Sequence, residues 1–182
     1  TLDAYESVEG LSGSKLNDVL TGADTLAEER LPAAQGGSEG FRGSALTKEG
    51  IQRIAGLQAV LGLTDAQMST LAANAIAYNA GEIILGGDGN DVIMGRAGDD
   101  IIDGDKWLNV RIAVHQSVGA DGGTGEILEY HSSMTTLAAK MFSGEINPGQ
   151  LQIVREIATA GADAIADIDT AKYQGLQSEY AF

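Results

Sequence analysis

The clearest pattern of apolar and polar positions has a period of nine residues and lies at the centre of the chain. Residues 86–94 read Gly-Gly-Asp-Gly-Asn-Asp-Val-Ile-Met, and residues 95–103 read Gly-Arg-Ala-Gly-Asp-Asp-Ile-Ile-Asp. Glycine, aspartate and aliphatic residues recur at matching positions of the two stretches, and residues 13–21 repeat a glycine, an aspartate and a leucine in the same places. A fixed period predicts stacked structural repeats, of which about three are needed for stability.

A helical pattern separates the first repeat from the other two. Residues 46–61 carry apolar side chains on one helical face, and Gly62 stands where a C-terminal cap is expected. Residues 64–67 form a capping box, which predicts a second amphipathic helix that continues through Ile76. Residues 23–43, with a proline and several glycines, predict an irregular surface excursion.

Strict alternation begins after the repeats. Residues 107–114 place leucine, valine and isoleucine on one face and polar residues with one tryptophan on the other, which predicts a half-buried strand. Three glycines within residues 122–125 mark a turn, and residues 127–130 are expected to return as the second strand of a hairpin.

Two further helices are expected near the end of the chain. Residues 134–142 predict a short helix that stops at Gly144. Asn147 and Pro148 have the residue types of a helix cap and a first helical position, and Leu151 begins an apolar face with a helical spacing.

Charge narrows the possible functions. The 182 residues include 26 acidic and 11 basic side chains, a formal net charge of −15. This balance argues against nucleic acid and anionic membranes as partners, because both need clustered Lys and Arg. Carboxylates favour hard divalent cations, although an acidic surface also serves solubility alone. Cysteine is absent, which excludes disulfides and thiolate metal sites.

No apolar run approaches the roughly 18 residues needed to cross a bilayer. The first residues, Thr1 to Tyr5, have no basic region followed by an apolar stretch and no initiating methionine. They do not form a signal peptide. We therefore expect the chain to be a piece of a longer protein.

The nine-residue pattern has the chemistry of a calcium site. Its glycines permit tight turns with inward carbonyls, its aspartate supplies a charged oxygen, and its aliphatic side chain fills a narrow core. Calcium takes six to eight oxygen ligands in flexible geometry, and two stacked turns offer several carbonyls and one carboxylate each.

These residues resemble the calcium-binding repeat of the RTX, or haemolysin-type, family, whose pattern is Gly-Gly-x-Gly-x-Asp-x-aliphatic-x. The resemblance is specific at 86–103 and weaker at 13–21. It implies an α+β fold with a short parallel β-roll over residues 1–105, interrupted by a helical insertion at about 23–80. Residues 106–182 are then expected to form a strand, a hairpin and helices that pack on the roll.

In such a roll, turns on the same side are two repeats apart. The resemblance therefore implies that Asp91 faces Asp18, that Asp100 pairs with Asp24, and that Asp105 lies near the 86–91 turn. Backbone carbonyls are expected to complete the calcium shells. The full set of expected metal ligands is Asp18, Asp24, Gly86, Asp88, Asp91, Gly95, Ala97, Asp100 and Asp105.

Several other metal and nucleotide sites fail on their spacing. An EF-hand starting at Asp88 has Val92 at its fifth position, and one starting at Asp99 has Ile101 at its third. A dinucleotide-binding loop lacks its third glycine, because Val92 stands there. His115 and His131 lack zinc-site spacing and are more simply explained as strand-edge or loop residues.

A longer likeness links the chain to the RTX-bearing region of bacterial haem peroxidases of the animal type. It is carried by residues 41–46, 103–111 and 146–151, and residues 169–180 resemble a segment that often begins a further module in such secreted proteins. It implies that any catalytic haem domain lies outside this chain, and we expect no enzyme activity here.

We expect a calcium-binding structural module of a secreted bacterial protein, exported by a type I route and folding when it meets external calcium. Its partners are calcium ions and the rest of the parent polypeptide. Two alternatives stay open: a peroxidase fragment, and an adhesion or surface-assembly module.

Overall fold

The computed structural model describes residues 10–24, 33–36, 46–159 and 167–175. The chain divides into two compact units. We call the first the repeat unit; it holds the described residues up to Leu108 and those from Ile157 onward. The second, the hairpin unit, is Asn109–Glu156. The C-terminal residues that we expected to group with the hairpin thus belong to the repeat unit.

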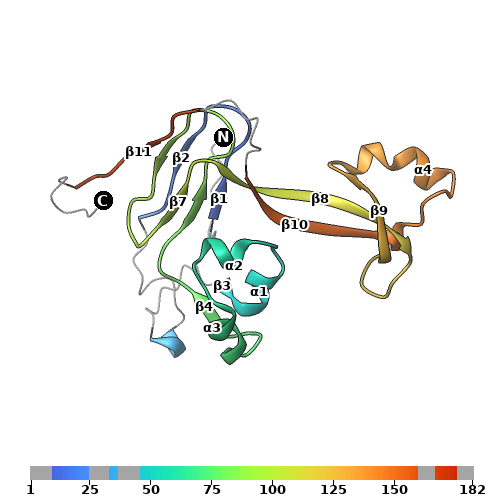
Figure 1. The fold of residues 1–182 in the computed structure, drawn as a ribbon, viewed down its shortest axis with the longest axis horizontal. Coiled ribbons are helices and arrows are strands. Elements are labelled where there is room, and N and C mark those ends of the chain that lie inside the picture. The colour runs from blue at the N-terminus through green and yellow to red at the C-terminus, as the bar shows by residue number, and fades with distance from the viewer. Residues whose placement is uncertain (1–9, 25–32, 37–45, 160–166, 176–182) are drawn as a thin grey trace. The chain divides into compact units, whose positions relative to one another are not determined.

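Two three-stranded parallel sheets form the repeat unit (Figure 1). Successive strands alternate between the sheets, as a nine-residue repeat with one short strand per repeat requires. The first sheet has the order β1-β5-β7, with the bounds Gly10–Ser12, Ile83–Leu85 and Ile101–Asp103. The second has the order β11-β6-β2, with the bounds Thr170–Ala171, Val92–Met94 and Val19–Thr21.

The aliphatic position of the repeat sets the register of both sheets. Ile84 pairs with Leu11 and Ile102 in the first sheet, and Ile93 pairs with Leu20 and Ala171 in the second. Ile84 and Ile93 are almost fully buried. Strands of three residues are marginal alone, so this ladder of buried aliphatic side chains stabilises them.

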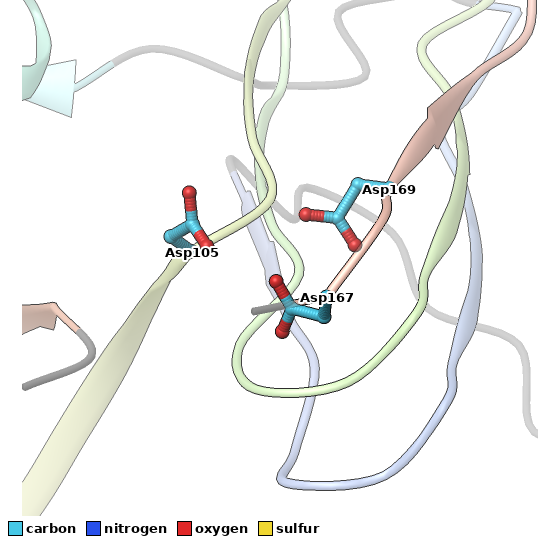
Figure 2. A group of neighbouring side chains, drawn as sticks. All are labelled: Asp105, Asp167 and Asp169. Atoms are coloured by element: carbon cyan, nitrogen blue, oxygen red, sulfur yellow. The ribbon is translucent and has the colours of Figure 1, made fainter. Parts of the chain in front are cut away.

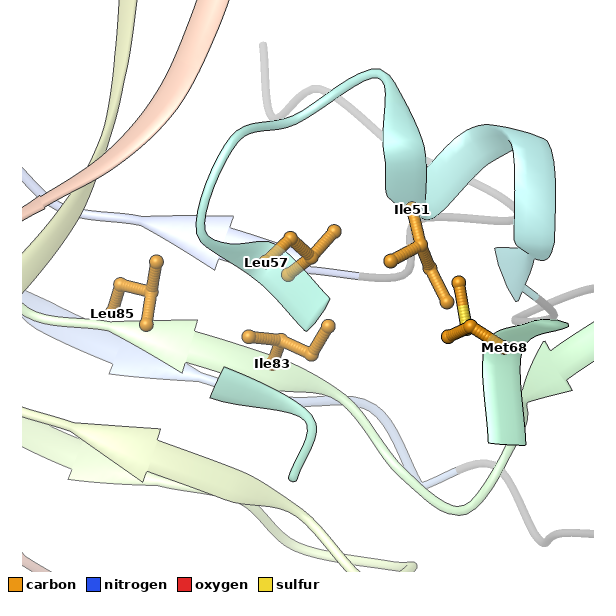
Figure 3. Packing of buried hydrophobic residues seen from close by; sticks show 5 residues of the cluster. All are labelled: Ile51, Leu57, Met68, Ile83 and Leu85. Carbon is orange, nitrogen blue, oxygen red and sulfur yellow. The ribbon is translucent and has the colours of Figure 1, made fainter. Parts of the chain in front are cut away.

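Three short helices cover strand β5 (Figure 3). They are α1 (Lys48–Gln52), α2 (Leu57–Val60) and α3 (Asp65–Thr70). A 3₁₀ turn, η2, spans Ala33–Gln35. The core of this region is one cluster of buried side chains from the helices and β5, made of Ile51, Leu57, Met68, Ile83 and Leu85. The apolar faces expected for the insertion are therefore core faces.

The single helix expected over 46–61 is wrong in its continuity. Thr47 caps α1 by accepting a hydrogen bond from the Gly50 backbone at 3.1 Å, so the helix begins only at Lys48. Gly56 has φ +83° and starts α2 afresh, because this left-handed conformation cannot continue a helix. Gly62, with φ +64°, lies just past α2, as expected.

The capping box of α3 is confirmed, but the helix is shorter than expected. Thr64 and Gln67 exchange hydrogen bonds at 3.2 and 2.8 Å. The chain leaves the helix after Thr70, and β4 (Ile76–Tyr78) pairs antiparallel with β3 (Leu46–Thr47). The carbonyls of Ala75 and Ala73, just before β4, accept hydrogen bonds from the first backbone N–H groups of α1, and these tertiary contacts override the helical pattern.

The hairpin unit contains three strands, two of which, β8 (Lys106–Ser117) and β10 (Leu151–Thr159), extend past the ends of the unit at Asn109 and Glu156. β8 and β9 (Thr124–His131) are antiparallel, and β10 lies on the other side of β8. The strand after the repeats, the glycine turn and the returning strand are confirmed. The expected half-buried alternation is wrong, because Ala113 and His115, opposite the predicted apolar face, are buried, whereas Val110 on that face is 47% exposed. Four buried residues form the core of the unit: Ile112, Val114, Leu137 and Ile146.

The last predicted helix is wrong, whereas the one before it is confirmed. A 3₁₀ turn, η3 (Met134–Thr136), leads into α4 (Ala138–Phe142), which ends before Gly144. The cap at Asn147 forms, yet it opens only one turn, η4 (Pro148–Gln150), before β10 begins. The segment from Leu151 onward instead pairs as a strand with the free edge of β8. Side chains of the two strands stabilise this pairing, since Glu156 accepts hydrogen bonds from Asn109 and Arg111 at 2.8 and 2.6 Å.

None of the helices in the described ranges is long and apolar enough to span a membrane. The surface excursion expected over 23–43 lies mostly outside the described residues.

Candidate metal centre

The turn of the first repeat lies directly against the turn of the second, although the helical insertion separates them in sequence. The backbone N–H groups of Gly13, Asp88 and Val92 donate across the two turns, to Leu85, Ser14 and Asp18, at 2.8 to 3.0 Å. Parallel pairing of β1 with β5 and of β2 with β6 places the turns in this register. The expected stacking of these two turns is therefore present.

Asp18 and Asp91 occupy the same position in their turns and are in contact. The Asp18 N–H donates to Asp91 Oδ1 at 2.7 Å. Asp18 Oδ2 in turn accepts hydrogen bonds from the Ser14 backbone and hydroxyl at 2.7 and 3.0 Å. The serine, which departs from the repeat pattern, thus satisfies the carboxylate of the outer turn.

A third layer continues the stack from a distant part of the chain. The Gly87 N–H donates to the Gly104 carbonyl at 2.8 Å. The Asp91 N–H donates to Asp169 Oδ1 at 2.8 Å, and the Gly89 N–H donates to Asp167 Oδ2 at 2.8 Å. Asp169 therefore accepts a hydrogen bond from the Asp91 backbone in the same way that Asp91 accepts one from the Asp18 backbone.

Sequence reasoning missed Asp167 and Asp169. The stretch Asp169-Thr-Ala-Lys has neither the preceding glycines nor the large aliphatic residue of the repeat. Its register is set by the strand pairing with β6 and by the hydrogen bond from Asp91. No local pattern reports that pairing, which spans about 78 residues of chain between Asp91 and Asp169.

The first glycine of each repeat is required by close packing. A Cβ on Gly13 would lie 2.8 Å from Asp18 Oδ2 and would also collide with the Gly86 carbonyl. The same arrangement recurs at three other glycines, where a carboxylate of the same layer occupies the space that a Cβ would fill. The pairs are Gly86 with Asp91, Gly95 with Asp100, and Gly104 with Asp169. The Gly86 position also adjoins the Gly104 carbonyl. Carboxylate and carbonyl oxygens from successive layers therefore converge where a side chain is absent.

Asp91 is the most enclosed of these carboxylates. The residue is 0% exposed, and its Oδ2 has no hydrogen-bond partner among the described residues. Desolvation raises the pKa of this carboxyl above its ordinary value, the hydrogen bond from Asp18 opposes the rise, and the negative charges of Asp169, Asp18 and Asp167 add to it. A buried carboxylate oxygen that lacks a hydrogen-bond partner and is surrounded by other negative charges is well suited to bind a cation.

Three carboxylates cluster at the open end of the stack (Figure 2). Asp105 follows β7, whereas Asp167 and Asp169 precede β11, and one oxygen from each lies within 4.8 Å of the others. Desolvation, followed by the charges of Asp167, Asp169 and Asp103, raises the Asp105 pKa, while Lys106 lowers it. Asp105 thus lies in the third layer of the stack, where its neighbour Gly104 meets the 86–91 turn.

The opposite side of the repeat unit has a second, different stack of turns. Asp100 Oδ1 accepts a hydrogen bond from the Glu82 backbone at 2.8 Å, and Gly95 lies against Gly22. The expected pairing of Asp100 with Asp24 is wrong. Asp24 instead forms an ion pair with Arg96 at 3.1 Å, and Glu82 takes the place beside Asp100 through its backbone hydrogen bond to that carboxylate.

Glu82 was also missed, although a signal for it existed. It precedes Asp91 by nine residues, and Asp91 precedes Asp100 by nine. The lack of glycines at the matching turn positions before Glu82 concealed the repeat. The residue is buried, at 3% exposure, in the layer that stacks on Asp100.

The expected ligands therefore fall into two groups. One side brings together Asp18, Gly86, Asp91 and Asp105, and it also holds Asp88, whose backbone joins the stacked turns. The other side brings together Gly95 and Asp100, with the half-buried Ala97 between them in the same turn. Asp24 joins neither group. Every converging group is an oxygen donor, which is the ligand set of a hard cation such as calcium.

Residues 76–106 match the family described as RTX calcium-binding nonapeptide repeat (4 copies). The match begins at β4 and ends just after Asp105, so it includes Glu82 as well as the two clear repeats. It implies calcium binding in a structural module. No curated protein and no solved structure matches the chain, so the likeness to haem peroxidases has no support there.

Proposed function

We propose that the repeat unit is a β-roll that binds calcium between its stacked turns and serves as a structural module of a larger secreted bacterial protein. The alternation of short parallel strands between two sheets supports the roll, and the repeat match at 76–106 supports calcium as the ion. Repeats of this kind are typical of secreted bacterial proteins, which supports the location.

One observation carries the proposal: Asp91 is fully buried and its Oδ2 lacks a hydrogen-bond partner among the described residues. An unpartnered buried carboxylate oxygen costs free energy that a bound cation recovers. The Gly104 carbonyl borders the same space beside Gly86, and Asp169 adds a carboxylate to the same layer. We propose these groups, with Asp18 and Gly86 in the layer before, as the ligands.

Calcium in this role acts through folding. The layers bring Asp18, Asp91, Asp167 and Asp169 together, and their mutual repulsion opposes stacking until a divalent ion neutralises it. Millimolar calcium outside the cell then stabilises the stacked form by linkage, whereas the low calcium of the cytosol leaves it open.

Calorimetry of calcium into chelator-stripped protein tests the proposal. Saturable binding that Asp91→Asn weakens about tenfold or more, with Asp121→Asn unchanged, is the expected result. Asp121 is the matched control, because it is an exposed aspartate in the hairpin unit. Absence of binding heat, or equal affinity in both variants, would overturn the assignment.

A further inference from the structure

Strand β11 docks on the repeat unit with little apolar burial. Both of its residues are exposed, and Ile168, just before it, is 77% exposed. At the aliphatic position it carries Ala171, whereas the strand on the other side of β6 carries Leu20. The hydrophobic effect therefore contributes little to holding this strand in place.

Backbone hydrogen bonds are the main favourable contacts of the same segment. Thr170 and Lys172 donate to the carbonyls of Asp91 and Ile93 at 2.8 and 2.7 Å, and the Ile168 N–H donates to the Asn90 side chain at 2.7 Å. Each such bond contributes only about 0.5–1.5 kcal/mol net, because the open strand bonds to water instead.

Docking this strand also concentrates negative charge. It brings Asp167 and Asp169 against Asp91, and it places their oxygens within 4.8 Å of an Asp105 oxygen. Like charges at this separation repel strongly when partly removed from water. The buried Oδ2 of Asp91, which has no hydrogen-bond partner among the described residues, adds a second unfavourable feature to the docked state.

We propose that residues 167–173 form a calcium-gated latch, a strand that docks on β6 when calcium is bound and leaves it when calcium is removed. The inference rests on the proposed calcium site. It adds that this strand depends on the ion more steeply than β5, β6 and β7, because those strands are also held by buried isoleucines such as Ile84 and Ile93.

Amide hydrogen exchange on the 182-residue chain, followed residue by residue by nuclear magnetic resonance, tests the latch. The probes are the amides of Thr170 and Lys172, and the reference is Ile101, whose N–H donates to the Glu82 carbonyl in the first sheet. In chelator, we expect protection at Thr170 and Lys172 to fall about tenfold or more beyond any fall at Ile101.

A charge-neutral variant separates the electrostatic cause from a general loss of structure. Asp167→Asn with Asp169→Asn keeps an oxygen that accepts from Gly89 and Asp91 while removing the repulsion. We expect this variant to retain Thr170 and Lys172 protection in chelator. The matched control, Asp121→Asn with Glu126→Gln, removes the same number of charges from exposed positions of the hairpin unit and should behave as the unchanged protein.

The outcomes distinguish the latch from the calcium site. If calorimetry shows calcium binding while the two probe amides keep equal protection with calcium and chelator, the latch is wrong and the site stands. If the probes and Ile101 lose protection by the same factor, the strand has no separate dependence and the latch is also wrong. If no calcium binds, both proposals fail together.

Discussion

The backbone N–H of Asp18 donates a hydrogen bond of 2.7 Å to the carboxylate of Asp91, 73 residues further along the chain. The same contact recurs one layer on, from Asp91 to Asp169. Asp91 and Asp169 thus each accept a hydrogen bond from the backbone N–H of the preceding aspartate, while their second carboxylate oxygens lie beside Gly86 and Gly104, respectively. This repeated geometry makes the aspartates one continuous array.

Replacing Asp91 by alanine should remove most of the calcium-dependent stability of the repeat unit. The substitution deletes the buried oxygen and leaves the Asp18 N–H without its acceptor, a loss of about 1–3 kcal/mol before the calcium contribution is counted. Calcium at a hundred times its dissociation constant adds about 2.7 kcal/mol to the unaltered protein by linkage. Denaturant unfolding with calcium and with chelator measures both effects. Equal stabilisation by calcium in the variant and the original would contradict this prediction.

Replacing Gly86 by alanine should disrupt the site by steric conflict. The added Cβ meets Asp91 Oδ2 and the Gly104 carbonyl, and overpacking of this kind costs about 1–3 kcal/mol. Gly62→Ala is the control, because Gly62 has φ +64° but no atom within 4 Å of its Cβ position.

The two glycine variants should therefore differ in calorimetry. Gly62→Ala is expected to lose about 1–2 kcal/mol of stability through backbone strain and to keep its calcium affinity. Gly86→Ala should lose both stability and calcium affinity. A Gly86→Ala protein that binds calcium normally would show that the turn can widen without harm to the site.

Stability without calcium should increase as the pH falls toward the raised pKa values of Asp91 and Asp105. A carboxyl with a raised pKa binds more protons folded than unfolded, from its ordinary value of 3.8 up to the folded value. Between these two pKa values, the contribution of the two groups to the free energy of unfolding increases as the pH falls. At pH values above the folded pKa, their contribution is least favourable.

The measurement is thermal unfolding of the repeat unit within the 182-residue chain at several pH values, in chelator and in excess calcium. Calcium should abolish the gain on mild acidification, because the ion competes with the proton and its affinity falls with the pH. Asp91→Asn, which has no proton to bind at this position, should show a smaller pH dependence in chelator. An unchanged dependence would contradict the assignment to Asp91.

The aliphatic ladder should matter for stability whether or not calcium is present. Ile84 is 0% exposed, so Ile84→Ala is expected to cost about 2–5 kcal/mol through lost burial and the cavity left behind. Ile168 is 77% exposed, and Ile168→Ala should change stability by less than about 0.5 kcal/mol. Denaturant unfolding in calcium compares the two. A similar cost for both would indicate that the ladder is not the core of the unit.

The sequence was sufficient where the determinant is local. The pattern around Asp91 and Asp100 predicts the turns, the strands and the oxygen-rich chemistry, because glycine, aspartate and isoleucine act within nine residues. The Thr64 capping box and the strand after the repeats are likewise confirmed, since each depends on near neighbours.

The sequence was insufficient where the structure depends on pairing between segments far apart in the chain. Asp169 gains its place from β6 and Glu82 from the neighbouring turn, so neither is visible in a local pattern. Leu151 to Ile157 fit a helix by spacing, and the open edge of β8 makes them a strand. Asp24 follows the first repeat as expected, yet Glu82 lies beside Asp100 in its place, and Asp24 pairs with Arg96.

The interruption of the strand ladder bears on how fast the repeat unit folds. Uninterrupted nonapeptide repeats bring together residues about eighteen positions apart, whereas here the aspartates of the three layers meet through contacts 73 and 78 residues apart. Such separations raise the contact order, and the entropy of loop closure has to be overcome before β2, β6 and β11 stabilise one another. The helices and the hairpin can form from near neighbours first, so the last and slowest event in folding should be the closure of the ladder.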